Sequence, residues 1–249
     1  MTKSERQHYI IERIVQEKKT NSFELSKILK TSIDTVRRDL NELNDKGLIS
    51  KVYGAVFPLE QKSNNVFDIV ILNENKKNTI GSKALALLQD GQVIIMSGGT
   101  TNLAFSKLIP SNLKATIYTY SLPIAMQLSQ HPNIDLIFIG GKMQKNAMVT
   151  IGIDVVESLS KINADICFMG VSSININSGL TEAGYEVSLI KKSMIKSSDK
   201  VIAMVTSEKI NTKMPHLVCE IEQLHTVITD LGTTDYRLQE FRKVKINLL

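Results

Sequence analysis

From about residue 76 onward, short runs of continuous apolar residues alternate with segments whose apolar residues recur every three or four positions. Continuous apolar strands separated by amphipathic helices are typical of a parallel sheet that is covered by helices on both faces. This part of the chain is therefore predicted to form a Rossmann-like α/β domain. Strands are expected at residues 92–96, 115–120, 134–139, 166–169, 200–205 and 226–229, and helices at 76–89, 102–109, 122–130, 154–160 and 185–197.

The first 57 residues have a different pattern. Apolar residues recur at helical spacing in residues 4–18 and 23–29, and again in the stretch TSIDTVRRDL, where Ser32 is placed to cap a third helix. Gly47 ends that helix, and the alternating residues 48–57 suggest a two-stranded hairpin. Three helices and a small hairpin in this order predict a winged helix-turn-helix whose third helix enters the major groove of DNA.

Charge alone does not establish DNA binding. A pair such as Arg37 and Arg38 is usually a solvated surface, and Lys3 and Arg6 are as easily solvated as placed on a phosphate backbone. Residues 1–57 contain 11 basic and 8 acidic residues, and the remainder contains 19 and 17. The order of the elements therefore favours DNA binding more than the charge does, and operator affinity should also depend on dimerisation and groove fit.

The same stretch resembles the DNA-binding signature of the DeoR family of bacterial transcription regulators. That signature reads Ser, two residues, Thr, an aliphatic residue and Arg-Arg-Asp-Leu, followed by Leu, Gly and a wing that usually ends in Gly-Gly-Ala. The positions that match are Ser32, Thr35, Val36, Arg37, Arg38, Asp39, Leu40, Leu43 and Gly47. The wing departs once, because Tyr53 replaces the first glycine. The resemblance implies that Ser32, Thr35, Arg37, Arg38 and Tyr53 bind DNA.

Length and composition restrict the other possibilities. A chain of 249 residues has room for a winged helix-turn-helix at 1–57, a linker at 58–74 and an α/β sensor domain at 75–249. The two cysteines and four histidines have no metal-ligand spacing, so we expect buried free thiols, no metal and no cofactor. No stretch is apolar enough to span a bilayer, and the N-terminus has no apolar secretion core, which predicts a cytoplasmic protein without a membrane partner.

The loop after the first predicted strand is a candidate phosphate site. Ligands of such sheets bind beyond the carboxyl ends of the strands, and residues 92–96 are followed by Ser97, Gly98, Gly99, Thr100 and Thr101 at the start of a helix. Glycines let backbone N–H groups approach an anion, a helix N-terminus supplies partial positive charge, and hydroxyls add donors. Turns of this composition are common, and only some of them bind phosphate.

The resemblance to the DeoR family extends through this loop. The family's effector domain shares its fold with ribose-5-phosphate isomerase-like proteins and typically carries Asp-Ser-Gly-Thr-Thr-Thr, where this chain has Ser97 to Asn102. Later landmarks match at Gly140, Gly141, Gly170, Gly179, Leu180, Thr181, Ser207 and Lys209. The resemblance implies an effector site formed by residues 97–101 together with Tyr120, Ser121, Gly141 and Lys209.

Three departures from the family pattern concern polar positions that would help to hold a sugar phosphate. Ser97 replaces Asp, Tyr120 replaces Asn, and Thr206 replaces Asp. Backbone groups supply most of the donors in a glycine-rich anion site, so phosphate binding should survive these changes. The sugar itself is expected to differ from the family's commonest one.

The leading functional prediction is a DNA-binding repressor of a sugar-utilisation operon. Its partners would be double-stranded operator DNA, a phosphorylated sugar that alters operator affinity, and further copies in a homodimer or homotetramer. An activator of the same family is one alternative. The other is a sugar-phosphate isomerase-like enzyme, but residues 171–175 offer no base for proton abstraction, and no catalytic residue is predicted. Glu186 is expected to order the site or to make a surface pair.

Overall fold

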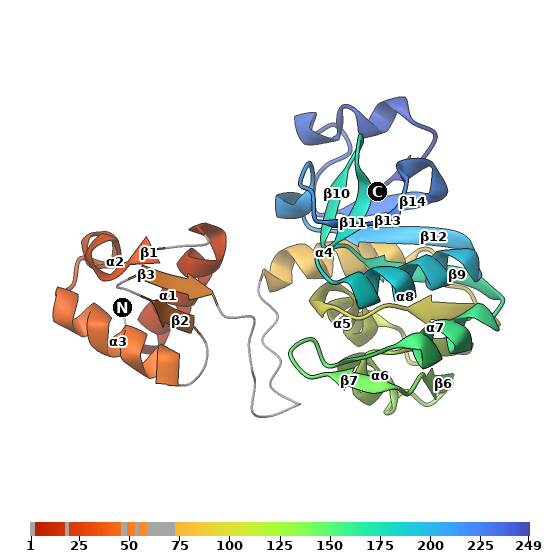
Figure 1. Ribbon diagram of the computed structural model, residues 1–249, viewed down its shortest axis with the longest axis horizontal. Coiled ribbons are helices and arrows are strands. Elements are labelled where there is room, and N and C mark those ends of the chain that lie inside the picture. The colour runs from red at the N-terminus through yellow and green to blue at the C-terminus, as the bar shows by residue number, and fades with distance from the viewer. Residues whose placement is uncertain (1–2, 18–19, 46–48, 53–54, 59–72) are drawn as a thin grey trace. The chain divides into compact units, whose positions relative to one another are not determined.

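The computed structural model describes residues 3–17, 20–45, 49–52, 55–58 and 73–249. The chain divides into two compact units, residues 1–72 and 73–249 (Figure 1). Tyr53 of the predicted wing and most of the predicted linker at 58–74 lie outside the described residues. No helix in the part of the chain that is described is long and apolar enough to cross a membrane.

The first unit contains three helices and a small antiparallel sheet, which confirms the predicted winged helix-turn-helix. Its elements are α1 (Lys3–Glu17), β1 (Thr20–Asn21), α2 (Ser22–Leu29), α3 (Ile33–Asp45), β2 (Ile49–Val52) and β3 (Ala55–Pro58). The helices and β2 share one core, made of Ile10, Ile14, Leu25, Val36, Leu40, Leu43 and Ile49. The sequence did not predict β1, which pairs with β3 beside the hairpin and is too short to leave a pattern.

Side chains cap two of these helices. Asn21 accepts hydrogen bonds from the backbone N–H groups of Phe23 and Glu24 at 3.1 and 3.0 Å, and so begins α2. Ser32 begins α3, because its hydroxyl accepts from the N–H of Thr35 at 3.1 Å. Such caps satisfy donors that have no partner inside the helix. The Ser32 cap fixes where the turn between α2 and α3 ends.

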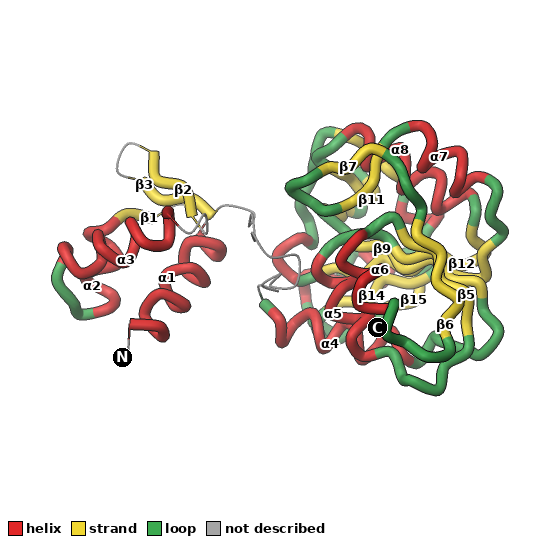
Figure 2. Tube along the Cα trace, turned by 90° about the horizontal axis from the view of Figure 1, so that it is seen from below, coloured by secondary structure: helices red, strands yellow, loops and turns green. Residues whose placement is uncertain are grey.

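The second unit is built on a seven-stranded sheet in which every pairing is parallel (Figure 2). Its strands are β4 (Val93–Met96), β5 (Ala115–Thr119), β6 (Ile134–Phe138), β9 (Ala164–Gly170), β12 (Ser198–Val205), β14 (Thr226–Thr229) and β15 (Asn247–Leu248). Its helices are α4 (Glu74–Leu85), α5 (Thr100–Leu108), α6 (Leu122–Leu128), α7 (Ile153–Ser160) and α8 (Tyr185–Lys196). The α/β class predicted from the sequence is therefore confirmed.

The strand order, β15-β14-β12-β9-β4-β5-β6, places a change of direction at the centre of the sheet. The chain runs outward from β4 through β5 to β6, returns, and then runs the other way from β9 through β12 to β14. In doubly wound sheets, ligands bind beyond the carboxyl ends of the two strands at such a point. The loops that follow β4 and β9 are therefore the place to look for a site.

The central strands are apolar without interruption because both of their faces are buried. On β9, Phe168 contacts Phe105 of α5, with ring centroids 4.7 Å apart. Its neighbours Cys167 and Met169 join a core cluster on the other face that includes Ile190 of α8. Cys167 and Cys219 are buried free thiols, as the sequence predicted.

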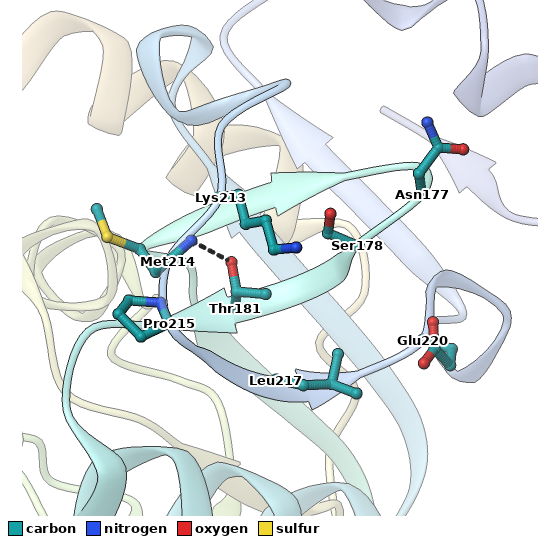
Figure 3. Close-up of a pocket in the computed structure, with 8 residues that line it drawn as sticks. All are labelled: Asn177, Ser178, Thr181, Lys213, Met214, Pro215, Leu217 and Glu220. Carbon is teal, nitrogen blue, oxygen red and sulfur yellow. Dashed lines mark hydrogen bonds between the residues drawn. The ribbon is translucent and has the colours of Figure 1, made fainter.

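Two antiparallel additions extend this unit, and the sequence predicted neither. One is the hairpin β7 (Lys142–Gln144) and β8 (Val149–Ile151), and the other is a three-stranded sheet of β10 (Ser173–Asn175), β11 (Gly179–Glu182) and β13 (His216–Cys219). An open pocket of about 290 Å³ lies on the three-stranded sheet, where the N–H of Met214 donates to the hydroxyl of Thr181 at 2.9 Å (Figure 3).

Gly179 sits at a tight position of that sheet, and its substitution should be costly. Its φ is +68°, and a Cβ there would lie 2.1 Å from the carbonyl oxygen of Cys219. We expect Gly179→Ala to lower the unfolding free energy of this unit by about 2–4 kcal/mol, because a left-handed backbone and a backbone clash add together. Calorimetry of the full chain should show a melting temperature lower by about 5–15 °C.

Gly232→Ala is the matched control for this substitution. Gly232 has an ordinary φ, and within the described part of the chain no atom lies within 4 Å of the place that its new methyl group would take. Its melting temperature should stay close to that of the unsubstituted protein. Equal melting temperatures for the two variants would contradict the steric argument for Gly179.

Candidate functional site

The outward face of α3 carries both signature arginines. Arg37 and Arg38 are exposed, whereas Val36 beside them is buried in the core of the first unit. Arg37 lies 3.6 Å from Asp34 one turn earlier, a surface ion pair of the kind that contributes little to stability and is easily exchanged for another partner. The guanidinium groups therefore sit where a recognition helix presents its side chains to a groove.

The remaining acidic residue of the signature has a different position. Asp39 is 2 % exposed and forms an ion pair with Arg6 of α1. Glu42, one turn further along α3, pairs with Lys3 of α1 at 2.6 Å. These contacts tie the first helix to the third. The Arg6 pair is largely buried and belongs to the packing of this unit, whereas the Lys3 pair is exposed and of the kind that exchanges easily.

The glycine-containing loop follows β4 and leads into α5, as the sequence predicted. Gly99 is the residue before the helix and has φ +108°, a conformation that side chains rarely adopt. Gly98 is needed for a different reason, since a Cβ there would lie 2.5 Å from a methyl group of Val149. Thr100 and Thr101 form the first turn of α5. We call residues 97–101 the cradle.

Two lysines from outside the cradle approach it. Lys77 of α4 is 7 % exposed and donates from Nζ to the hydroxyl of Thr100 at 2.8 Å. Lys209 lies in a short 3₁₀ turn after β12 and donates to the carbonyl oxygen of Val171 at 2.8 Å. Burial, and after it the positive charge of Lys209, lower the pKa of Lys77 to about 8.

This arrangement favours an anion. The buried ammonium of Lys77 is disfavoured by the positive charge of Lys209 and lies beside a helix N-terminus whose backbone N–H groups have no partner inside the helix. An anion in the cradle would relieve the repulsion and accept hydrogen bonds from several directions. A lysine whose pKa is lowered by burial and by a named charge at the ligand end of a sheet is a functional-site candidate on physical grounds.

Ser97 and Asn102 fasten the cradle to the neighbouring strand. The amide of Asn102 donates to the Ser97 hydroxyl at 2.9 Å and to the carbonyl oxygen of Phe168 at 3.1 Å. The N–H of Gly170 donates to the same Ser97 hydroxyl at 2.8 Å. Ser97 and Asn102 replace the Asp and Thr of the family pattern, and here they are partners in one hydrogen bond. The two residues that depart from the family pattern are therefore hydrogen-bonded to each other.

Several polar side chains at and near the predicted effector site are buried. Ser97, Tyr120, Ser121 and Thr206 are at most 2 % exposed. Burial raises the pKa of the Tyr120 phenol, whose hydrogen bonds are with the Gly98 backbone and the Ser97 side chain. Ser97 and Tyr120 thus take part in the internal hydrogen bonds of the cradle. The effector role of Ser97, Tyr120 and Ser121 and the expectation of a different sugar stay predictions.

The other predicted residues divide between the cradle and its surroundings. Thr100 and Lys209 lie at the cradle, and Thr101 is buried in the first turn of α5. Gly141 is exposed and lies against Val155 and Ile151, next to the hairpin. Gly141 and Gly98 of the cradle lie against the same strand, β8, through Ile151 and Val149 respectively.

A buried ion pair lies at the end of β9, and the sequence did not predict it. Lys191 of α8 pairs with Glu182 of β11 and also donates to the carbonyl oxygen of Gly170 at 2.8 Å. The hydroxyl of Ser172 donates to Glu182 at 2.7 Å. Burial acts to raise the pKa of Glu182, but the charge and hydrogen bond of Lys191 lower it below its ordinary value. A lowered pKa and the bonds to Lys191 and Ser172 make this carboxylate a weak base, which does not suit proton abstraction.

Two lysines near the site were not singled out from the sequence. Lys77 and Lys191 lie on helices, where a lysine is normally a solvated side chain. Glu186, which was expected to order the site or to make a surface pair, is exposed at the start of α8. One signal was available, since Lys76 and Lys77 stand in the first turn of a helix, where the helix dipole disfavours cations. Among the residues that the structure describes, no group of His, Cys, Asp and Glu could hold a metal ion.

The two units together define a class of protein. A winged helix-turn-helix with exposed arginines, followed by an α/β domain with a buried lysine beside the loop at its switch point, is the architecture of a DNA-binding regulator that carries its own sensor.

Comparison with known proteins identifies the family. The model of the DeoR-like helix-turn-helix domain matches residues 6–62, and that of the DeoR C-terminal sensor domain matches residues 72–231. The regulator GolR of Listeria innocua is 32 % identical over 91 % of this chain and 90 % of its own length. The repressor GlcR of Bacillus subtilis is 29 % identical over 92 % and 89 %. The chain belongs to the DeoR family and is a DNA-binding transcriptional regulator, not an enzyme.

A solved structure also resembles part of the chain. Ribose 5-phosphate isomerase A from Methanocaldococcus jannaschii covers 55 % of this chain and 54 % of its own, with 20 % identity and a TM-score of 0.41.

The pKa of Lys77 leads to a prediction about pH. A bound anion holds Lys77 protonated, so its pKa is higher in the complex than the value of about 8 in the free protein. Below this value Lys77 carries its proton in both states. Above it, binding must take up a proton, and anion affinity should fall by up to about tenfold per pH unit.

Phosphorus NMR titration with inorganic phosphate between about pH 8 and 9.5 would measure this slope, since phosphate is mostly a dianion there. Lys77→Met is the control, and in it the contribution of Lys77 to the slope should vanish. The same pH dependence in both proteins would show that Lys77 does not contact the anion.

Proposed function

We propose that this regulator represses a sugar-utilisation operon and that a phosphorylated sugar bound at the cradle alters its affinity for operator DNA. The observation that carries the proposal is the buried ammonium of Lys77, which points at the first turn of α5 beside two glycines. Lys209 supplies a second positive charge. Phosphate carries two negative charges at neutral pH and several acceptor oxygens, which suits this set of donors.

The sugar would occupy the space between the cradle and the loop after β9. The segment after β9 offers the partly exposed hydroxyl of Ser172 and the partly exposed amide of Asn175 in β10, which are suited to hydrogen bonds with sugar hydroxyls. The ion pair of Lys191 and Glu182 holds the loop in place from behind. We therefore assign the phosphate to the cradle and the choice of sugar to this loop.

DNA binding would use α3 in the major groove. Arg37 and Arg38 are suited to guanine edges or phosphates, and Thr35, whose hydroxyl lies 2.8 Å from that of Ser32, stands at the start of the helix. Tyr53 remains a proposed contact from the wing. Because operators are read as two half-sites, we propose a homodimer or homotetramer. Repression is supported by the relative that is named a repressor.

The test is a gel-shift or anisotropy assay with a duplex from the promoter region of the chain's own gene. Glucose 6-phosphate, fructose 6-phosphate and ribose 5-phosphate would be added in turn, each against its unphosphorylated sugar at equal ionic strength. We expect one phosphate to change operator affinity about five- to 150-fold and its parent sugar to have no effect. Equal effects of sugar and sugar phosphate would rule out the cradle as the effector site. A reporter fused to the operon distinguishes repression from activation.

A further inference from the structure

The first turn of α4 contacts two separate parts of the effector site. Successive residues on a helix project about 100° apart, so adjacent lysines can reach different neighbours. Lys77 reaches Thr100 in the cradle. Lys76 donates from Nζ to the hydroxyl of Ser207 at 2.9 Å and to Glu208 at 3.1 Å, in the turn that also carries Lys209.

The contact made by Lys76 is part of a larger network. Lys76 also lies 3.9 Å from Asp230, which accepts from the N–H of Ser207 at 2.6 Å. The amide of Asn73 donates to Glu208 at 3.4 Å from the position just before α4, where its φ is +56°. Burial acts to raise the pKa of Glu208, but hydrogen bonds from Thr206, its own backbone and Lys76 lower it to about 2. The start of α4 is thus fixed to this turn by charged groups.

An anion in the cradle would act both on α4 and on the turn at Ser207–Lys209. It would attract Lys77 on α4 and Lys209 on the turn, and Lys76 ties the same helix to the same turn. The compact second unit begins at Asn73, so α4 is the first element that the chain enters from the preceding segment. A change in the position or orientation of the first turn of α4 therefore changes where the preceding segment joins the sensor unit.

We infer that the first turn of α4 is the element that reports anion binding to the rest of the chain, and that Lys76 is its positioning residue. Lys77 belongs to the ligand site, whereas Lys76 transmits without touching the ligand. The inference rests on the proposed function. Its physical content is a coupling free energy: the anion must favour one setting of the turn over another, and operator affinity must depend on that setting.

The experiment separates anion affinity from coupling in the full-length protein. Inorganic phosphate is the probe, because the inference assigns the signal to the phosphate group, and chloride at equal ionic strength is the reference. Phosphate binding is measured by phosphorus NMR, and operator affinity by anisotropy with and without saturating phosphate. Lys76→Met is compared with Lys243→Met, which removes an exposed lysine paired only with Glu240 in the described contacts of its side chain.

We expect the unsubstituted protein and Lys243→Met to show the same phosphate-dependent change in operator affinity, about fivefold or more. Lys76→Met should bind phosphate within about threefold of the unsubstituted protein but change operator affinity less than about twofold. Glu208→Gln removes the opposite charge of the contact and should give the same loss, which guards against a folding defect in one variant.

Full phosphate-dependent coupling in both Lys76→Met and Glu208→Gln would overturn the inference and leave the proposed function standing. Phosphate binding without any effect on operator affinity in the unsubstituted protein would also overturn it. Absence of phosphate and sugar phosphate binding at the cradle would instead overturn the proposed function, and the inference with it.

Discussion

Replacement of Arg38 by alanine is expected to weaken operator binding by about five- to 150-fold, which corresponds to about 1–3 kcal/mol for one good arginine contact to a base. The side chain is exposed on α3, and the apolar face of this helix is formed by other residues. Folding of both units should therefore be unchanged. Fluorescence anisotropy with operator duplex, at a stated salt concentration, measures the loss.

The pattern of the loss distinguishes the two kinds of contact that an arginine makes. If Arg38 reads a base, its removal relaxes the preference for one operator position; if it binds phosphate, affinity falls for all sequences and the salt dependence becomes shallower. Arg37→Ala provides the comparison, because Arg37 has Asp34 as a partner in the free protein. Lys243→Ala removes a charge from the second unit and should leave operator affinity unchanged. Unchanged affinity in Arg38→Ala would exclude this face of α3 from the operator interface.

Replacement of Lys77 by methionine is expected to reduce the affinity for inorganic phosphate by about 10- to 150-fold. A hydrogen bond to a charged group contributes about 1.5–3 kcal/mol, and Lys77 is the buried cation of the cradle. Methionine has a similar length and no charge. Because burial disfavours the ammonium that it replaces, the melting temperature of the free protein should stay the same or rise.

This combination of results is informative because a merely unfolded site would show a lower melting temperature. Lys107→Met is the matched control, since Lys107 is an exposed residue in the last turn of α5, at the end opposite the cradle. It should leave both the melting temperature and the phosphate affinity unchanged. Normal phosphate binding by Lys77→Met, with the same protein stability, would remove Lys77 from the effector site.

Much of the fold could be predicted because the patterns are local and strong. The strands of the large sheet are buried on both faces, so each leaves an uninterrupted apolar run, as β9 does. The small antiparallel sheet escaped prediction because its strands are three or four residues long and contain polar residues, as in Ser173–Asn175. The helix α5 begins at Thr100, two residues before its predicted start, because two threonines look like a loop in sequence.

The site could be predicted only where its residues are contiguous. The cradle is one stretch of chain, and its glycines mark it directly. Lys77 and Lys191 reach it from helices far away in sequence, and no local pattern separates Lys77 from its neighbour Lys76. Ser97 was predicted as a ligand group because the family pattern is polar there, and the structure adds an internal partner for its hydroxyl. Its bond to Asn102 depends on packing, which sequence spacing does not reveal.

The central position of the candidate site has one more consequence. The two loops that would form it follow β4 and β9, and these strands begin the two halves of the sheet that the chain builds in opposite directions. A small molecule that contacts both loops would link the two halves of the sheet. Ligand binding should therefore slow amide hydrogen exchange across the whole sheet and sharpen thermal unfolding into one transition. The stabilising effect would extend well beyond the atoms that touch the ligand.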